Sequence, residues 1–149
     1  MRQDSIPLGG LIDIIHRNHI IYLNAESKKF GITATGFIIM MYLSQNQNVI
    51  QDYVARCFHI NKSAIARAVQ KLENAGFVHR IVEPSNRRAS HLFLTEKGTE
   101  IIQEMARIEK LWEDTALASA SEEKRSQVYL LLSGMVQSSL IIAGKYSDE

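Results

Sequence analysis

Residues 61–74, NKSAIARAVQKLEN, place polar and basic side chains on one face of a predicted helix. Helical spacing aligns Ser63, Ala66, Arg67, Gln70 and Asn74, and Lys62 and Lys71 flank them. An α-helix fits the major groove of B-form DNA, where arginine can pair with guanine and glutamine with adenine, while Lys62 and Ser63 suit phosphates. This face therefore predicts contact with double-stranded DNA, and an ordinary solvated surface is the alternative that this helix alone does not exclude.

The adjacent arginines Arg87 and Arg88 fall between two segments that favour β-strands, Val78–Val82 and His91–Leu94. Pro84, Ser85 and Asn86 form turns readily, so the segment predicts a hairpin with a loop longer than a minimal turn. Its tip would lie beside the candidate recognition helix, where the two arginines can reach phosphates or a minor groove. The alternative is a loop held by ion pairs with Glu83 or Glu96, but such surface pairs contribute only about 0–1 kcal/mol.

Two short helices are expected to position the polar face. The first spans Ile50 to Phe58 and is predicted to turn Val54, Cys57 and Phe58 inward. The second has Asn61 at its N-cap and Gly76 after its last turn. Its buried stripe is predicted to consist of Ile65, Ala68, Val69 and Leu72. Two helices joined by about four residues in this way form a helix-turn-helix.

Longer apolar helices surround this core. One covers Leu8 to Leu23, and the next is capped by Thr33 or Thr35 and ends in the polar SQNQN segment. Thr95 caps a helix over Glu96 to Leu117, and Ser121 caps the last helix, which is apolar over much of its circumference. Because the first and last helices exceed what a small core can cover, the sequence predicts a second subunit packed against them.

Composition indicates a globular chain with an uneven distribution of charge. The 149 residues are 46% hydrophobic and 22% charged, with a net charge of +1. Residues 45–98 carry eight basic and four acidic side chains, whereas residues 99–149 carry five basic and nine acidic ones. A basic middle segment suits a polyanionic partner. A single cysteine, no secretory signal and no predicted membrane span favour a cytoplasmic protein without a membrane partner.

Residues 33–98 resemble the winged helix of the MarR family of transcription regulators. The segment NKSAIARAVQKLENAGFVHRIVEPSNRRASHLFLTEKG carries the resemblance, and the flanking helices are similar to that family's dimerisation arms. The resemblance implies a mainly α fold with a small β-wing, one domain over 1–149, a winged helix over 33–98, and dimerisation helices over 6–28 and 96–145. It also implies a homodimer on a pseudo-palindromic operator, usually a repressor relieved by a small aromatic or phenolic effector.

The DNA-binding residues expected from this comparison are Lys62, Ser63, Arg67, Gln70, Lys71, Asn86, Arg87 and Arg88. The chain departs from the family at three positions. Ala64 and Ala66 stand where the family often has threonine or serine, and Asn86 stands where the wing usually has an aspartate. These departures keep a second hypothesis open, in which the winged helix is a protein-interaction module.

Other side chains could form a pocket or a sensor, with core packing as the alternative. The expected effector pocket consists of His16, His19, Met40, Met105 and Trp112, although apolar stripes are core by default. His16 and His19 lack the further ligands that a metal site needs, so His19 is predicted to be a hydrogen-bonded core or pocket histidine. Cys57 is predicted to be buried, which disfavours a redox-responsive regulator. No catalytic motif or cofactor signature is present, so neither an enzyme nor a bound cofactor or metal is expected.

Overall fold

A computed structural model describes residues 5–84 and 86–144, with the side chains of residues 86–89 outside the description. The chain forms two compact units, one up to Trp112 and one from Glu113 onward. Helix α5 (Glu96–Ala116) crosses the boundary between them.

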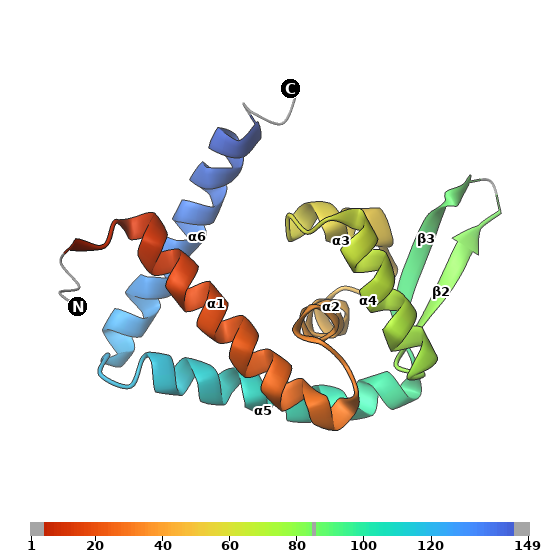
Figure 1. Ribbon diagram of the computed structural model, residues 1–149, viewed down its shortest axis with the longest axis horizontal. Coiled ribbons are helices and arrows are strands. Elements are labelled where there is room, and N and C mark those ends of the chain that lie inside the picture. The colour runs from red at the N-terminus through yellow and green to blue at the C-terminus, as the bar shows by residue number, and fades with distance from the viewer. Residues whose placement is uncertain (1–4, 85, 145–149) are drawn as a thin grey trace. The chain divides into compact units, whose positions relative to one another are not determined.

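The first unit combines helices with one small sheet (Figure 1). Its elements in chain order are α1 (Leu8–Ser27), the short 3-10 helix η2 (Lys28–Phe30), α2 (Ala34–Gln45), β1 (Val49–Ile50), α3 (Gln51–Cys57), α4 (Lys62–Asn74), β2 (Val78–Glu83), β3 (Asn86–Leu94) and most of α5. The second unit contains α6 (Glu122–Gly144). The prediction of a mainly α fold with a β-wing is confirmed.

Helix α2 forms the centre of the first unit. Its sequence is apolar on most sides, and Phe37, Ile39, Met40 and Leu43 are almost completely buried. The surrounding elements contribute the other fully buried side chains, including Leu23, Ile65, Val69, Leu72, Leu92 and Met105. Burial of each large apolar side chain contributes about 1.5–3 kcal/mol. This shared core fixes α4 and the sheet relative to α2.

The expected caps are present at the starts of α2, α4 and α5; for α5, the Oγ1 of Thr95 accepts from the backbone N–H of Gly98 at 3.0 Å. The Oγ1 of Thr33, rather than that of Thr35, accepts from the backbone N–H of Gly36 at 3.3 Å. The Oδ1 of Asn61 accepts from the N–H of Ser63 at 2.8 Å. After α4, Gly76 adopts a φ of +77°, which glycine tolerates better than other residues. Caps are predicted well because each depends on neighbours in the sequence.

The sheet has the strand order β1-β3-β2 and is antiparallel throughout. Strand β1 was not predicted, since Ile50 was placed at the start of a helix; Val49 instead pairs with Leu92 of β3. The prediction of a long hairpin loop was also wrong. Strand β2 continues to Glu83 and β3 begins at Asn86, so the backbones of Arg87 and Arg88 belong to β3 rather than to a loop. A register shift between Val82 and Glu83 accompanies the pairing.

Polar contacts join α1 and η2 to the first-unit part of α5. The hydroxyl of Tyr22 donates to the carbonyl of Ile108 at 2.9 Å, and burial raises the pKa of Tyr22. The Nζ of Lys29 donates to the Oε1 of Glu104 at 2.7 Å. This hydrogen bond lowers the pKa of Glu104 and raises the pKa of Lys29, since it favours both charged forms.

Helix α6 begins with a polar turn and continues as an apolar rod. The Oγ of Ser121 accepts from the N–H of Lys124 at 3.4 Å, as the predicted cap requires. Arg125 donates to Asp114 at 2.9 Å within the same unit. None of the described residues of α6 is buried, and the most exposed leucine, Leu130, retains 79% of its accessible area. An exposed apolar surface of this kind is typical of a site that a protein partner or a membrane covers.

Candidate nucleic-acid interface

Helix α4 presents the predicted polar face to solvent. Ile65, Val69 and Leu72 are fully buried, so the rotation of the helix is fixed by its apolar stripe. The opposite side is exposed and carries Lys62, Ser63, Arg67, Gln70, Lys71 and Asn74. The structure therefore brings together all five of the DNA-binding residues expected on this helix.

The first turn of α4 is organised by its cap. The Oδ1 of Asn61 also accepts from the hydroxyl of Ser63 at 2.6 Å. The guanidinium of Arg67 lies one turn further along, with its Nη1 at 3.5 Å from the Oγ of Ser63. Lys62 forms an ion pair with Asp52 of α3 at 2.7 Å, which links the two helices of the motif. Among the described residues, Arg67 thus makes one long hydrogen bond, to Ser63, while Lys62 is already paired with Asp52.

Gln70 lies in a network that the sequence did not reveal. Its Oε1 accepts from the Nη2 of Arg80 in β2 at 2.8 Å, and its Nε2 donates to the Oδ1 of Asn74 at 3.1 Å. Arg80 also forms an ion pair with Glu73 of α4 and donates to the Oε1 of Gln51 at 3.4 Å. No sequence motif indicates Arg80 as part of the site, because its network joins three separate elements.

A polar cleft of about 340 Å³ opens beside α4. Arg67 and Lys71 line it from α4, and Thr33 and Thr35 line it from the start of α2. The first-turn amides of Ala34 and Gly36 are already satisfied by Asn24 and Thr33. Arg67 and Lys71 are therefore the cationic groups that this cleft offers to an anion.

The wing extends beside α4 (Figure 1). The β2–β3 hairpin pairs from Val78↔Leu94 to Glu83↔Asn86, and Arg80 joins its β2 strand to α4. The side chains of Asn86, Arg87 and Arg88 lie outside the described residues, so their part in the interface stays a prediction. Their backbone positions place them in the first three residues of β3.

Cys57 does not face inward as predicted, and Phe58 does so only in part, since its ring packs edge-on against that of Tyr42. Both are exposed at the end of α3, where the chain enters the four-residue turn that leads to α4. Only Val54 of the predicted inward set is buried. The helix ends one turn after Val54, so the residues that follow it leave the core. Cys57 lies near Tyr53, and its hydrogen bond to Tyr53 raises the pKa of that tyrosine.

A small apolar hollow lies between α1, α2, α5 and the end of α3. It has a volume of about 220 Å³ and is lined by His19, Phe37, Ile38, Met41, Tyr42, Phe58 and Glu109. The Nε2 of His19 lies 3.1 Å from the Oε1 of Glu109, and its ring contacts that of Trp112 with centroids 4.2 Å apart. His19 is therefore the hydrogen-bonded pocket histidine that was predicted.

The other predicted pocket residues are placed differently. Met40 and Met105 are fully buried in the core and do not line the hollow; Met41, one position along α2, does. His16 is exposed on α1, one turn before His19. Within residues 5–84 and 86–144, no three His, Cys, Asp or Glu side chains are grouped as a metal site would require.

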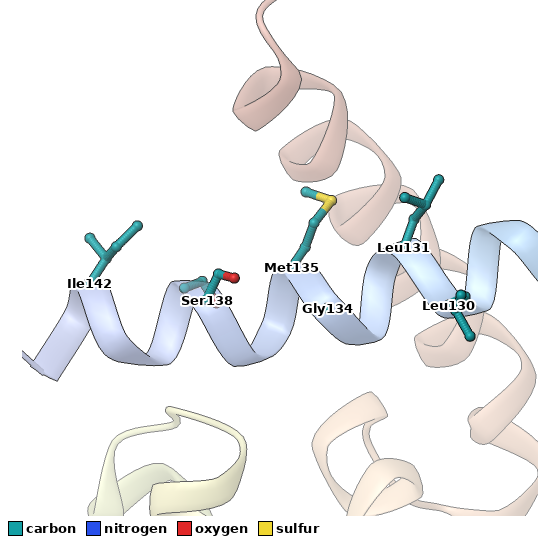
Figure 2. A pocket seen from close by; sticks show the side chains of 7 residues that line it. Leu130, Leu131, Gly134, Met135, Ser138 and Ile142 are labelled. Atoms are coloured by element: carbon teal, nitrogen blue, oxygen red, sulfur yellow. The ribbon is translucent and has the colours of Figure 1, made fainter.

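A second hollow runs along α6, in the unit from Glu113 onward (Figure 2). It has a volume of about 530 Å³ and is lined by Leu130, Leu131, Gly134, Met135, Ser138, Ser139 and Ile142. These residues recur every three to four positions and so form one stripe of a single helix. A hollow with a wall from only one helix is a packing face rather than an enclosed ligand site.

These features define a winged helix-turn-helix protein. A recognition helix with an exposed cationic face is held by a buried stripe, and a β-hairpin lies beside it. Residues 30–89 match the model of the MarR family. The chain belongs to this family, whose members are regulators of transcription and not enzymes.

Three similar proteins illustrate this relationship. A crystal structure of MarR has 30% sequence identity and a TM-score of 0.88, covering 97% of this chain and 98% of that chain. The transcriptional repressor MprA of Escherichia coli (strain K12) is 30% identical over 112 residues, which are 70% of this chain and 62% of MprA. The S. aureus MepR–DNA complex shares the fold, with a TM-score of 0.77, 20% identity, and coverage of 90% of this chain and 99% of that chain.

Proposed function

We propose that the chain is a sequence-specific DNA-binding regulator that acts as a cytoplasmic homodimer and represses transcription by occupying its operator. The exposed cationic face of α4, set by the buried stripe on its other side, is the observation that carries this proposal. MprA is named as a repressor and MepR was solved with DNA, which supports the same role here. Two recognition helices would enter successive major grooves, about 34–36 Å apart.

The wing would add contacts outside the major groove. We propose that Asn86, Arg87 and Arg88 approach phosphates or the neighbouring minor groove, while Lys62, Ser63 and Lys71 contact phosphates near the recognition helix. Such contacts position the protein on DNA without selecting a sequence. Arg67 and Gln70 would then supply the sequence preference.

A gel shift with random genomic fragments at two salt concentrations tests the proposal. Selective retention of a few fragments, with affinity that falls steeply as salt rises, is the expected result, because each phosphate contact contributes about 0.9 to the log–log slope. Inverted repeats in the retained fragments would identify the operator. Failure to retain any fragment at low salt would favour the protein-interaction hypothesis instead.

Arg67→Ala is expected to weaken binding to the selected operator by about 1–3 kcal/mol and to relax preference at one base position per half-site. The reason is the loss of a bidentate contact to guanine. Fluorescence anisotropy with a panel of single-base operator variants measures both effects. The matched control is Arg107→Ala, since Arg107 is an exposed arginine on α5. Unchanged preference at every position in the Arg67→Ala protein would contradict a base-reading role.

Replacing Arg87 and Arg88 together with alanine should have a different signature. Affinity is expected to fall for all duplexes alike, and the log–log salt slope should become shallower by about 0.9 for each phosphate that the wing no longer neutralises. Titrations of one operator and one unrelated duplex at four salt concentrations provide the comparison. An unaltered slope would place the two arginines away from the phosphates.

We further propose that a small aromatic or phenolic effector binds in the hollow beside His19. Phe37, Ile38 and Met41 supply apolar walls, and His19 and Glu109 supply hydrogen-bonding groups. Phe58 lines the same hollow and lies in the turn before α4. A bound effector would therefore contact the turn that precedes the recognition helix α4. Displacement of this turn would relieve repression.

His19→Phe is expected to raise the phenol concentration needed for release of the operator roughly fivefold, because the ring is kept while a hydrogen bond of about 1 kcal/mol is removed. Phenol titrated into the preformed complex, followed by anisotropy, measures this shift. His16→Phe is the control, since His16 is exposed and does not line the hollow. Equal phenol sensitivity in both variants would exclude the hollow as the effector site.

A further inference from the structure

The orientation of the Gln70 side-chain amide is fixed by a residue outside the recognition helix. A guanidinium can only donate hydrogen bonds, and the Nη2 of Arg80 lies 2.8 Å from the Oε1 of Gln70. The reversed amide would place an NH₂ group against this donor. The Nε2 of Gln70 in turn donates to the Oδ1 of Asn74 at 3.1 Å, which agrees with the orientation that Arg80 requires.

This arrangement leaves a defined set of hydrogen-bonding positions. The amide oxygen has two acceptor positions and the amide nitrogen has two donor positions, and Arg80 and Asn74 occupy one of each. One acceptor position and one donor position remain on the exposed Gln70 side chain. Adenine offers the complementary pair in the major groove, its N6–H₂ donor and its N7 acceptor.

Arg80 is itself held by groups from other elements. Its guanidinium forms an ion pair with Glu73, one turn after Gln70 on α4, and contacts the Oε1 of Gln51 at the start of α3. Its backbone lies within β2, where Arg80 pairs with Leu92 of β3. Both side chains of the ion pair are mostly buried, with 26% of Arg80 and 22% of Glu73 exposed. The network therefore joins both helices of the helix-turn-helix to the sheet.

We propose that Arg80 is a positioning residue for base recognition: through Gln51, Glu73 and the Gln70 amide oxygen it presets Gln70 to read adenine. This inference rests on the proposed function, because it requires α4 to enter the major groove. Arg80 does not touch the base; it acts through Gln70. The wing thereby contributes to sequence preference as well as to phosphate contact.

The test measures base preference in a double-mutant cycle. Wild type, Gln70→Ala, Arg80→Met and the double variant are titrated with operator duplexes in which each position is replaced by each other base. Gln70→Ala is expected to remove a preference for adenine of roughly five- to a hundredfold at one position per half-site. Arg80→Met is expected to reduce preference at that same position at least fivefold, and the double variant should match Gln70→Ala.

A purely structural role would give a different pattern. Arg80→Met would then weaken binding to every duplex equally, keep the preference for adenine and add to the effect of Gln70→Ala, and this result would overturn the inference. If Arg80→Met does not fold, Arg80→Lys is used in its place. This variant keeps a positive charge beside Glu73 but removes the planar guanidinium group. It is expected to give an intermediate loss of preference at the same position, and full preference in this variant would overturn the inference as well.

The DNA-binding function and the positioning role of Arg80 can be refuted by different results. Wild-type protein that binds no duplex, or binds all duplexes equally, would refute the DNA-binding function and the role of Arg80 together. Wild-type protein with a preference for adenine that depends on Gln70 and is insensitive to Arg80 would refute the positioning role alone.

Discussion

Replacing Leu131 and Ile142 of α6 with aspartate is expected to convert the protein from a dimer to a monomer and to weaken operator binding at least a hundredfold. Both side chains are exposed in the described structure, at 67% and 58%, so the charges should not disturb the fold of one chain. In a dimer they would be buried without partners, which is strongly unfavourable. Linked half-site contacts exceed single contacts by about 10²–10⁴ in affinity, and this gain would disappear.

Sedimentation equilibrium and operator titration measure the two effects. Wild type should have twice the chain mass of 16.9 kDa and the variant that mass itself. Ser133→Asp is the matched control, because it adds a charge to an exposed position of the same helix outside the apolar stripe. A variant that remains dimeric would show that the stripe in Figure 2 is not the interface.

Helix α6 also meets the length and composition criteria for a membrane span, with a mean hydropathy of 1.4 over its most apolar window. Within the described residues no other helix meets them. The proposed dimer would provide an alternative cover for this surface, because a partner helix buries apolar side chains equally well. A wild-type protein that is a stable dimer in buffer without detergent is the expected result, and a requirement for detergent would favour a membrane.

Gly98→Ala is expected to destabilise the fold by about 3 kcal/mol, which corresponds to a fall in melting temperature of roughly 6–12 °C. A Cβ at this position would lie 2.1 Å from the carbonyl oxygen of Phe77 and 3.0 Å from its carbonyl carbon. That carbonyl is backbone, and it also accepts from the N–H of Thr95 at 3.0 Å, so it cannot move without loss of a hydrogen bond. Overpacking against fixed backbone is among the most costly single substitutions.

Thermal unfolding followed by circular dichroism measures the effect. Gly9→Ala is the control, since a Cβ there meets nothing within 4 Å and alanine favours a helix by about 0.5–1 kcal/mol over glycine. The control should melt at or slightly above the wild-type temperature. A Gly98→Ala protein that melts within about 2 °C of wild type would show that α5 can shift away from Phe77 at little cost.

The parts of the fold that depend on neighbouring residues were predictable from the sequence. The caps at Thr33 and Asn61, the end of α4 at Gly76, and the buried stripe through Val69 follow from local chemistry and helical spacing. The exposed face of α4 was predictable as well, because it consists of the residues that are left once the buried stripe is assigned. These elements supply most of the candidate interface.

The features that depend on distant partners were not predictable. A two-residue strand such as β1 has no periodicity, and only its pairing with β3 defines it. Cysteine is a residue type that is usually buried, but Cys57 lies at the exposed end of α3. The role assigned to Arg80 needs Gln51, Gln70 and Glu73 together, and the sequence separates these partners by 7 to 29 positions from Arg80.

Thr95 connects two elements through one hydroxyl group. Its Oγ1 donates to the carbonyl of Gly76 at 2.6 Å and accepts from the N–H of Gly98 at 3.0 Å. Lys97 adds a hydrogen bond from its Nζ to the carbonyl of Ala75 at 2.7 Å, so the end of the recognition helix and the start of α5 are joined directly. A tilt of the start of α5 would consequently carry the end of the recognition helix with it, so that in the proposed dimer such a tilt would change the distance between the two recognition helices.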